Sequence, residues 1–235
     1  NNSAKTRARK ASSLRVFFDY LNKKTELLPN NPVTELEFPT PKKSLPKYLS
    51  LEQAIELLAT VDGPYAERDY CILTLFLNCG LRLSELVGIN CNDFSENTLR
   101  VIGKGNKERI IYVNDACKNA VEDYLPERPK IKNTDALFIS RNGNRISRRR
   151  VQEIVENALK KCGLGNAGFS THKLRHTAAT LMYQHGNVDV RILKEILGHE
   201  NLATTEIYTH VSNDQMAKAM SDSPLSKIHK KAKKE

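Results

Sequence analysis

Apolar residues recur at helical spacing near the start of the chain. Leu14, Phe17, Phe18 and Leu21 fall at positions i, i+3, i+4 and i+7, which places their side chains on one face of a helix. The pattern predicts a single helix over residues 3–28, with Lys and Arg on its other faces. Because an amphipathic helix is not stable alone, we expect this apolar stripe to pack on another element.

Proline-rich sequence separates this helix from the rest of the chain. The segment PNNPVTELEFPTPKKSLPKYLS (29–50) holds five prolines. Proline fixes φ and removes a hydrogen-bond donor, so we expect an extended linker. The predicted organisation is the helical end of one domain (1–28), a linker (29–47), a second domain (48–222) and a basic tail (223–235).

From Ser50 onward the pattern is mostly helical. Ser50 and Gln53 fit an N-cap and its capping-box partner. The apolar run RDYCILTLFLNCG predicts a buried helix that ends at Gly80. Further helices are expected over Ser147–Cys162, Ser170–His185 and Asp189–Leu197, with a short helix around Tyr208.

One stretch has strand character instead. In TLRVIGKGNKERIIYV (98–113), two β-rich runs flank the glycine-containing turn GKGNKE. This arrangement is typical of a hairpin. The predicted fold class is therefore mainly α with a small antiparallel β-sheet.

The composition favours a polyanionic partner. The 235 residues include 37 Lys and Arg against 27 Asp and Glu, with a net charge of +10 and a pI near 9.4. Nucleic acid is the first candidate, and a soluble protein with basic tails is the alternative. We expect no membrane partner, because neither an apolar span nor a signal peptide is visible. Five cysteines without a CxxC pair fit reduced thiols in the cytosol. Since the first residue is Asn1 rather than Met, we expect the chain to start inside a longer protein.

Four clusters of side chains could carry chemistry, and two lie in the first half of the chain. In CGLRLSEL, Arg82 stands between the helix stop Gly80 and the start of the next helix, and Glu85 can brace its guanidinium. In IGKGNKER, Lys104 lies on a glycine-lined turn and can reach a ligand. The pattern G-x-x-x-x-G-K-[ST] is absent, which argues against nucleotide hydrolysis. A surface ion pair and a solvated lysine are the structural alternatives.

The third cluster, STHKLRHTAATL, places His172 and Arg175 on one helical face. His176 lies four residues after His172, so a metal site is an alternative. The stretch reads H-K-L-R-H instead of H-E-x-x-H, and no carboxylate or cysteine ligand is close in sequence. We therefore expect no metal here.

The fourth cluster is LGHENLATTEIYTH. His199 follows the helix stop Gly198, and Tyr208 comes nine residues after His199. One interpretation is a polar turn residue and a core tyrosine. The other is a nucleophilic tyrosine that shares one phosphate with the histidine.

Together the clusters follow the order R…K…H-x-x-R…H…Y. They and the strings GLRLSEL, VIGKGNKER, HKLRH and ILGHENLATTEIYTHV resemble the tyrosine recombinases (lambda-integrase family), most closely the Xer and transposon-integrase branch, over about residues 46–215. The resemblance implies the catalytic domain of that family, preceded by the last helix of a helical core-binding domain (1–28) whose remainder we expect to be missing here. It implies six active-site residues: Arg82, Lys104, His172, Arg175, His199 and Tyr208.

The resemblance also implies a reaction. DNA strands would be cleaved and rejoined through a 3′-phosphotyrosyl intermediate, without metal, cofactor or ATP. Tyr208 would be the nucleophile and Lys104 the general acid for the leaving 5′-oxygen. The two arginines would grip the phosphate oxygens, with Glu85 in support. The two histidines would add donors, and His172 would help to take the tyrosine proton.

The implied partner is double-stranded DNA with a specific recombination site, bound by a homo-tetramer in the cytoplasm at the nucleoid. A second recombinase or an accessory protein is a further candidate partner. Chromosome dimer resolution and mobile-element integration or excision both fit. A type IB topoisomerase, a non-catalytic DNA-binding protein and a metal nuclease are the alternatives. Met216, Ala219 and Met220 would pack on a neighbouring subunit or on their own domain. Candidate contacts to the DNA backbone are Arg7, Arg9, Lys10, Lys42, Lys43, Lys47, Arg141, Arg145, Arg148, Arg149 and Arg150.

Overall fold

The computed structural model divides the chain into two compact units, Asn1–Pro46 and Lys47–Glu235. Each unit is described by itself. The described residues are 2–25, 27–34, 47–186, 188–198 and 213–228.

Among the described residues of the first unit there is one helix, α1 (Ala4–Lys23). Ser3 caps it, since its hydroxyl accepts a hydrogen bond from the backbone N–H of Thr6 at 3.2 Å. The predicted helix exists, but it ends at Lys23 instead of residue 28. Thr25 donates its hydroxyl proton to a backbone carbonyl of the last turn, a local bond that competes with a further helical turn.

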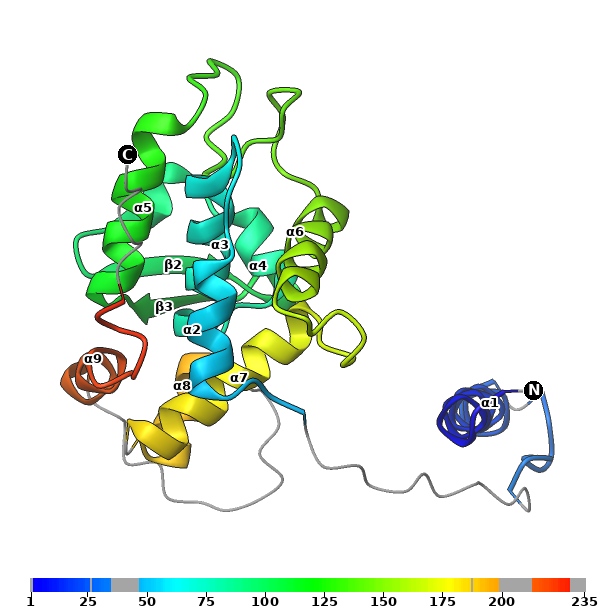
Figure 1. Ribbon diagram of the computed structural model, residues 1–235. Coiled ribbons are helices and arrows are strands. Elements are labelled where there is room, and N and C mark those ends of the chain that lie inside the picture. The colour runs from blue at the N-terminus through cyan, green and yellow to red at the C-terminus, as the bar shows by residue number, and fades with distance from the viewer. Residues whose placement is uncertain (1, 26, 35–46, 187, 199–212, 229–235) are drawn as a thin grey trace. The chain divides into compact units, whose positions relative to one another are not determined.

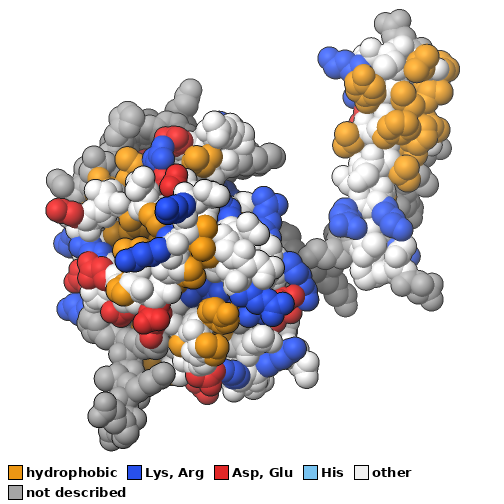
Figure 2. All heavy atoms as spheres, turned by 90° about the horizontal axis from the view of Figure 1, so that it is seen from above, with side chains coloured by type: hydrophobic (Ala, Val, Ile, Leu, Met, Phe, Trp, Pro, Cys, Tyr) orange, Lys and Arg blue, Asp and Glu red, His pale blue; other side chains and the backbone are white. Residues whose placement is uncertain are grey.

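The apolar stripe of α1 is covered only in part. Leu14 and Phe17 are exposed, as are Val16 and Tyr20 beside them, whereas Phe18 and Leu21 are half-buried. Figure 2 shows hydrophobic side chains gathered along one side of this unit. The described residues of the first unit thus provide only part of the expected packing of the stripe.

A three-stranded antiparallel sheet forms in the second unit. Its order is β1 (Phe94–Ser95), β2 (Thr98–Ile102), β3 (Glu108–Tyr112). The register pairs Val101 with Arg109, and the short 3-10 helix η2 (Lys104–Asn106) closes the turn. The predicted hairpin is confirmed.

Helices surround this sheet and form the core. Figure 1 shows α3 in the middle of the unit, where it packs mainly on α5 and α7. Almost every side chain of α3 is buried, as its continuous apolar run predicts. The bounds are α2 (Leu51–Ala59), α3 (Ala66–Cys79), α4 (Leu83–Gly88), η1 (Cys91–Asp93), α5 (Asp115–Glu127), α6 (Arg148–Lys161), α7 (Thr171–His185), α8 (Val190–Leu197) and α9 (Asn213–Ser221).

Two local predictions about helix ends are confirmed. Ser50 accepts from the N–H of Gln53 at 3.2 Å, and the Gln53 side chain accepts from the N–H of Ser50 at 3.0 Å. Gly80 ends α3 in the left-handed conformation, with φ 58°. The short helix expected around Tyr208 lies outside the described residues.

The sequence analysis did not predict α5. Its buried stripe contains Ala116, Cys117, Ala120 and Val121, and these small side chains give a weaker hydrophobic signal than leucine or phenylalanine. Pro126 in its last turn further weakens the pattern. The helix is stabilised by its packing against α3.

The described C-terminal residues pack on their own unit. Ala219 and Met220 of α9 are buried, as are Ser223 and Leu225, and the backbone N–H of Ala116 donates to Ser226 at 2.8 Å. Of the two placements considered for Ala219 and Met220, their own domain is correct, and the Met216 side chain lies outside the described residues. The first part of the expected tail (223–235) belongs to the packed core.

Two further observations concern the expected environment. The five cysteines are free thiols. Within the described ranges, no helix is both long and apolar enough to cross a bilayer.

Candidate active site

The end of α3 is placed so that α8 can lie against it. A Cβ at Gly80 would be 2.6 Å from Cδ2 of Leu197, closer than side-chain atoms approach one another. Glycine at this position therefore serves both the positive φ and the contact between the two helix ends. Two residues later the chain enters α4, with Arg82 at its N-cap.

Glu85 is the centre of the site. Its carboxylate is completely buried, and it accepts from the backbone N–H of Arg82 at 2.7 Å and from Nη1 of Arg82 at 2.8 Å. The predicted bracing of Arg82 by Glu85 is present. The backbone and the side chain of one arginine thus hold the carboxylate at the start of α4.

A second arginine binds the same carboxylate. Arg109 of β3 donates from Nη1 to Oε1 of Glu85 at 2.6 Å and from Nη2 to Oε2 at 2.9 Å, a bidentate pair. The sequence analysis missed Arg109. The available signal was strand alternation, because Arg109 shares the inward face of β3 with Ile111.

Arg175 joins the cluster from α7. Its Nη1 lies 3.9 Å from Oε2 of Glu85, and the guanidinium donates to the carbonyls of Gly80 at 2.6 Å and Leu197 at 2.5 Å. Burial, followed by the positive charge of Arg82, lowers the pKa of Arg175 to about 10. The guanidinium is therefore still charged at neutral pH.

The cluster carries excess positive charge. Burial alone would raise the pKa of Glu85, but hydrogen bonds from Arg109 and from the Arg82 backbone outweigh it and lower the pKa to about 2. One carboxylate thus faces three guanidinium groups, which leaves a net charge of +2. Arg82 keeps 36% of its side chain exposed, so this charge is accessible to an anion.

The end of α8 is tied to the same arginines. Nη2 of Arg82 donates to the carbonyl of Gly198 at 2.7 Å, next to the Leu197 carbonyl that Arg175 binds. Carbonyls at a helix C-terminus carry partial negative charge and lack donors within the helix. Gly198, at the end of a described range, is therefore held at the cluster.

The structure describes the other predicted active-site residues to different extents. His172 is exposed on the first turn of α7, three residues before the buried Arg175. Lys104 begins the hairpin turn, and its side chain lies outside the described residues. His199 and Tyr208 also lie outside them. A Cβ at Gly103 would be only 3.6 Å from Oε1 of Glu85, so the turn that carries Lys104 starts beside the cluster.

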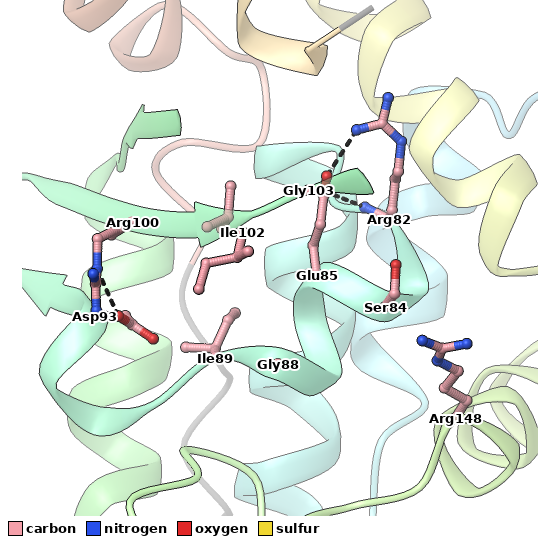
Figure 3. A pocket seen from close by; sticks show the side chains of 11 residues that line it. Arg82, Ser84, Glu85, Gly88, Ile89, Asp93, Arg100, Ile102, Gly103 and Arg148 are labelled. Atoms are coloured by element: carbon pink, nitrogen blue, oxygen red, sulfur yellow. Dashed lines mark hydrogen bonds and ion pairs between the residues drawn. The ribbon is translucent and has the colours of Figure 1, made fainter. Parts of the chain in front are cut away.

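A pocket of about 460 Å³ opens beside Arg82. Figure 3 shows Arg82 and Arg148 on one side of it and the Arg100–Asp93 pair on the other. Arg100 donates to Oδ1 of Asp93 from Nε at 2.9 Å and from Nη2 at 2.6 Å, so its guanidinium is held by that carboxylate. Arg148 lines the pocket from the first turn of α6.

The candidate DNA-backbone contacts have different surroundings. Arg145 donates to the carbonyls of Val87 at 2.8 Å and Ile89 at 3.0 Å, a structural role at the end of α4. Arg149 and Arg150 pair with Glu153. The exposed side chains among these candidates are Arg7, Arg9, Lys10, Lys47, Arg141, Arg145, Arg148 and Arg149. Lys47 donates to a backbone carbonyl, and Lys42 and Lys43 lie outside the described residues.

Basic side chains are spread over the second unit. In the view of Figure 2, blue Lys and Arg groups are interleaved with red Asp and Glu groups and with polar and apolar side chains over the face shown. A phosphate backbone could be neutralised over such a surface without one continuous basic groove.

Two histidines of α7, His172 and His176, were considered above as metal ligands. Burial, followed by Lys173 and His172, lowers the pKa of His176. Across the part of the chain that the structure describes, no three His, Cys, Asp or Glu side chains come together in a way that could hold a metal ion.

Comparisons with known proteins show the family of this chain. The model of the phage integrase family matches residues 47–215. A tyrosine recombinase XerC of Caldanaerobacter subterraneus subsp. tengcongensis is 53% identical over 228 residues, 96% of this chain and 65% of the relative. The chain thus spans just under two thirds of that protein.

Two solved structures share the fold. The XerH site-specific recombinase bound to palindromic difH substrate, in a post-cleavage complex, gives a TM-score of 0.72 at 23% identity over 85% of this chain and 62% of that one. A lambda integrase tetramer bound to a Holliday junction gives 0.60 at 18% identity over 84% and 59%. The chain therefore belongs to the phage integrase family, the tyrosine recombinases, and its 53% identical relative is of the Xer type.

Proposed function

We propose that this chain carries the catalytic domain of a site-specific DNA recombinase, which cleaves and rejoins strands through a 3′-phosphotyrosyl intermediate. The supporting observation is the convergence of Arg82 and Arg175 on the buried Glu85 carboxylate. The resulting net positive cluster suits a phosphodiester, in which negative charge builds up on the non-bridging oxygens during cleavage.

In the proposed cleavage step, the phenolic oxygen of Tyr208 attacks the scissile phosphorus. The bond from phosphorus to the 5′-oxygen breaks as the tyrosyl–phosphorus bond forms. Lys104 gives a proton to the leaving 5′-oxygen, and His172 helps to accept the phenol proton. The tyrosine pKa near 10 in water makes nearby positive charge useful, because it favours the phenolate.

The guanidinium groups stabilise the transition state. Arg82 and Arg175 would donate to the non-bridging oxygens, with His172 and His199 as further donors. Removal of one such preorganised donor typically costs 10² to 10³ in rate, about 3–4 kcal/mol. The phosphotyrosyl bond retains the energy of the phosphodiester, so a free 5′-hydroxyl of another strand reverses the step without ATP or metal.

Double-stranded DNA with a recombination site is the proposed substrate, and a homo-tetramer is the proposed assembly. The XerH structure with difH substrate supports the first, and the lambda integrase tetramer on a Holliday junction supports the second. Of the two biological roles that the family leaves open, we favour chromosome dimer resolution, because the 53% identical relative is a tyrosine recombinase XerC.

Covalent capture tests this function. The full-length protein is incubated with fragmented genomic DNA of its own organism, denatured, and separated from free DNA. The attached fragments are sequenced to identify the site, and a nicked suicide duplex is built on that site. We expect a covalent adduct with EDTA present, and none with Tyr208→Phe. Wild-type protein without adduct, or an adduct that persists in Tyr208→Phe, would contradict the proposal.

A further inference from the structure

Arg109 touches three segments that converge on the site. It donates two hydrogen bonds to Glu85 of α4. A Cβ at Gly103, where the hairpin turn begins, would lie 3.8 Å from its Nη1. A Cβ at Gly198, at the end of α8, would lie 3.1 Å from its Cδ and 3.2 Å from its Nε. One side chain of β3 thus lies against α4, the hairpin turn and the end of α8.

Half of the hydrogen bonds that hold Glu85 come from this residue. Among the described residues, Glu85 accepts four: two from Arg82 and two from Arg109. Each carboxylate oxygen accepts one hydrogen bond from Arg82 and one from Arg109. Without Arg109, each carboxylate oxygen would keep one hydrogen bond from Arg82, and the longer approach of Arg175 would be the other contact. The carboxylate would then be held mainly by the residue that it has to orient.

We propose that Arg109 is a positioning residue, which fixes the Glu85 carboxylate so that Arg82 is presented to the scissile phosphate. The inference rests on the recombinase function proposed above. Arg109 does not need to contact DNA for this role, because its side chain is only 17% exposed and its two Nη groups are used by Glu85.

The geometry requires arginine in particular. A guanidinium presents two parallel N–H groups to the two oxygens of one carboxylate, whereas an ammonium is a point charge on a flexible stem. Arg109→Lys therefore keeps the charge of the cluster and loses the fixed orientation. This separates positioning from simple electrostatic attraction.

The first test measures adduct formation on the suicide duplex found by covalent capture, under single-turnover conditions. We expect Arg109→Lys to slow cleavage about 100-fold, as small displacements of catalytic groups do. The matched control is Arg68→Lys in α3, which also pairs with a carboxylate, that of Asp69, and is not one of the residues that line the pocket beside Arg82. We expect the control to cleave at the wild-type rate. Rates are compared at temperatures where circular dichroism shows each variant folded, and Arg109→Gln is the second variant if Arg109→Lys does not fold.

The second test uses the pH profile, which a merely structural role would not move. Glu85 faces Arg82 at the start of α4, Arg109 on β3 and Arg175 on α7. Removing Arg109 takes away the strongest influence that lowers the pKa of Glu85, so this pKa rises. The carboxylate then protonates at a higher pH as the solution is acidified. We expect the acid limb of the cleavage rate to move to higher pH in Arg109→Gln and to stay in place in Arg68→Gln.

The third test distinguishes an effect of Arg109 on Arg82 from an effect of Arg109 on protonation of the leaving 5′-oxygen. A duplex with sulfur in place of the 5′-bridging oxygen needs no proton donor, since thiols are far stronger acids than alcohols. We expect this substrate to leave the defect of Arg109→Lys unchanged. If this substrate restored the rate of Arg109→Lys, Arg109 would act by positioning the hairpin that carries Lys104, and the proposal would be overturned.

The proposal is also wrong if Arg109→Lys cleaves as fast as wild type, or if Arg68→Lys is equally slow. These outcomes differ from a failure of the proposed function. In that case the wild-type protein itself forms no adduct, and no comparison between variants arises.

Discussion

Arg175 donates a hydrogen bond to the carbonyl of Leu197 at 2.5 Å, which links α7 to the C-terminal end of α8. The same guanidinium donates to the carbonyl of Gly80 at the end of α3. Each of these helix ends has carbonyls without donors within the helix. An arginine that we propose to bind phosphate therefore also joins two helix ends, and its removal has consequences for both stability and chemistry.

Two residues on one turn of α7 should separate these consequences. Arg175→Ala removes the hydrogen bonds to the carbonyls of Gly80 and Leu197, so we expect the free energy of unfolding to fall by about 3 kcal/mol. His172→Ala changes an exposed side chain and should alter it by less than about 0.5 kcal/mol. Urea denaturation measures both values.

The same two variants differ in what their activity reports. Both should lower the single-turnover rate of adduct formation, His172→Ala without any loss of stability. If both substitutions lowered the free energy of unfolding equally, the prediction would be wrong, because the buried Arg175 would then contribute no more to stability than the exposed His172.

Glu85 should make the stability of the domain depend on pH in the acid range. Its pKa is lowered from the ordinary value of 4.5 to about 2 in the folded protein. A carboxyl group whose pKa is lower in the folded than in the unfolded protein stabilises the fold at pH values above its unfolded pKa. This stabilisation is lost as the pH falls through the folded pKa. The lowering corresponds to about 3 kcal/mol, lost between about pH 4.5 and 2.

The matched variant for this prediction is Glu85→Gln. It removes the titrating group, so the free energy of unfolding should be lower than that of wild type at pH 7 and should fall less steeply between pH 5 and 3. Thermal or urea unfolding over this range gives the slope. A variant with the full wild-type slope would mean that other carboxyl groups cause the acid dependence.

Gly80→Ala should destabilise the domain through two separate effects. Alanine is strained at φ 58°, and its Cβ would lie 2.6 Å from Leu197. Gly163 has φ 70° but no atom within 4 Å of such a Cβ, so Gly163→Ala measures the strain alone, about 1 kcal/mol. We expect Gly80→Ala to cost at least 1 kcal/mol more, and to slow cleavage because α8 is displaced. Equal losses in urea denaturation would contradict the close contact of the helix ends.

Arg145 and Arg148 should differ in their contribution to DNA binding. Arg145 holds backbone carbonyls at the end of α4, so Arg145→Ala should lower stability by about 1 kcal/mol and leave the salt dependence of binding unchanged. Arg148 lies at the pocket beside Arg82, and Arg148→Ala should reduce the slope of log K against log salt by about 1. Fluorescence anisotropy with a duplex at several salt concentrations measures the slope. The opposite assignment of the two effects would show that Arg145 contacts phosphate.

Local sequence patterns were sufficient for several elements. The capping box of Ser50 and Gln53, the end of α3 at Gly80 and the β2–β3 hairpin each depend on residues close together in sequence, and each is found in the structure. By contrast, α5 escaped prediction because its stripe consists largely of small side chains. Its stability depends on packing against α3, which no local pattern reports.

The sequence by itself determined which residue types are available for the chemistry, including Arg82, Lys104, His172 and Arg175, and it determined the positive charge of the chain. Only the tertiary structure decided that Glu85 is the common partner of three arginines, that Arg109 is one of them, and that Arg175 is buried while His172 is exposed. The physical reason is that these contacts join α4, β3 and α7, which are far apart in sequence. Periodicity orients side chains within one element, and packing between elements decides which of them meet.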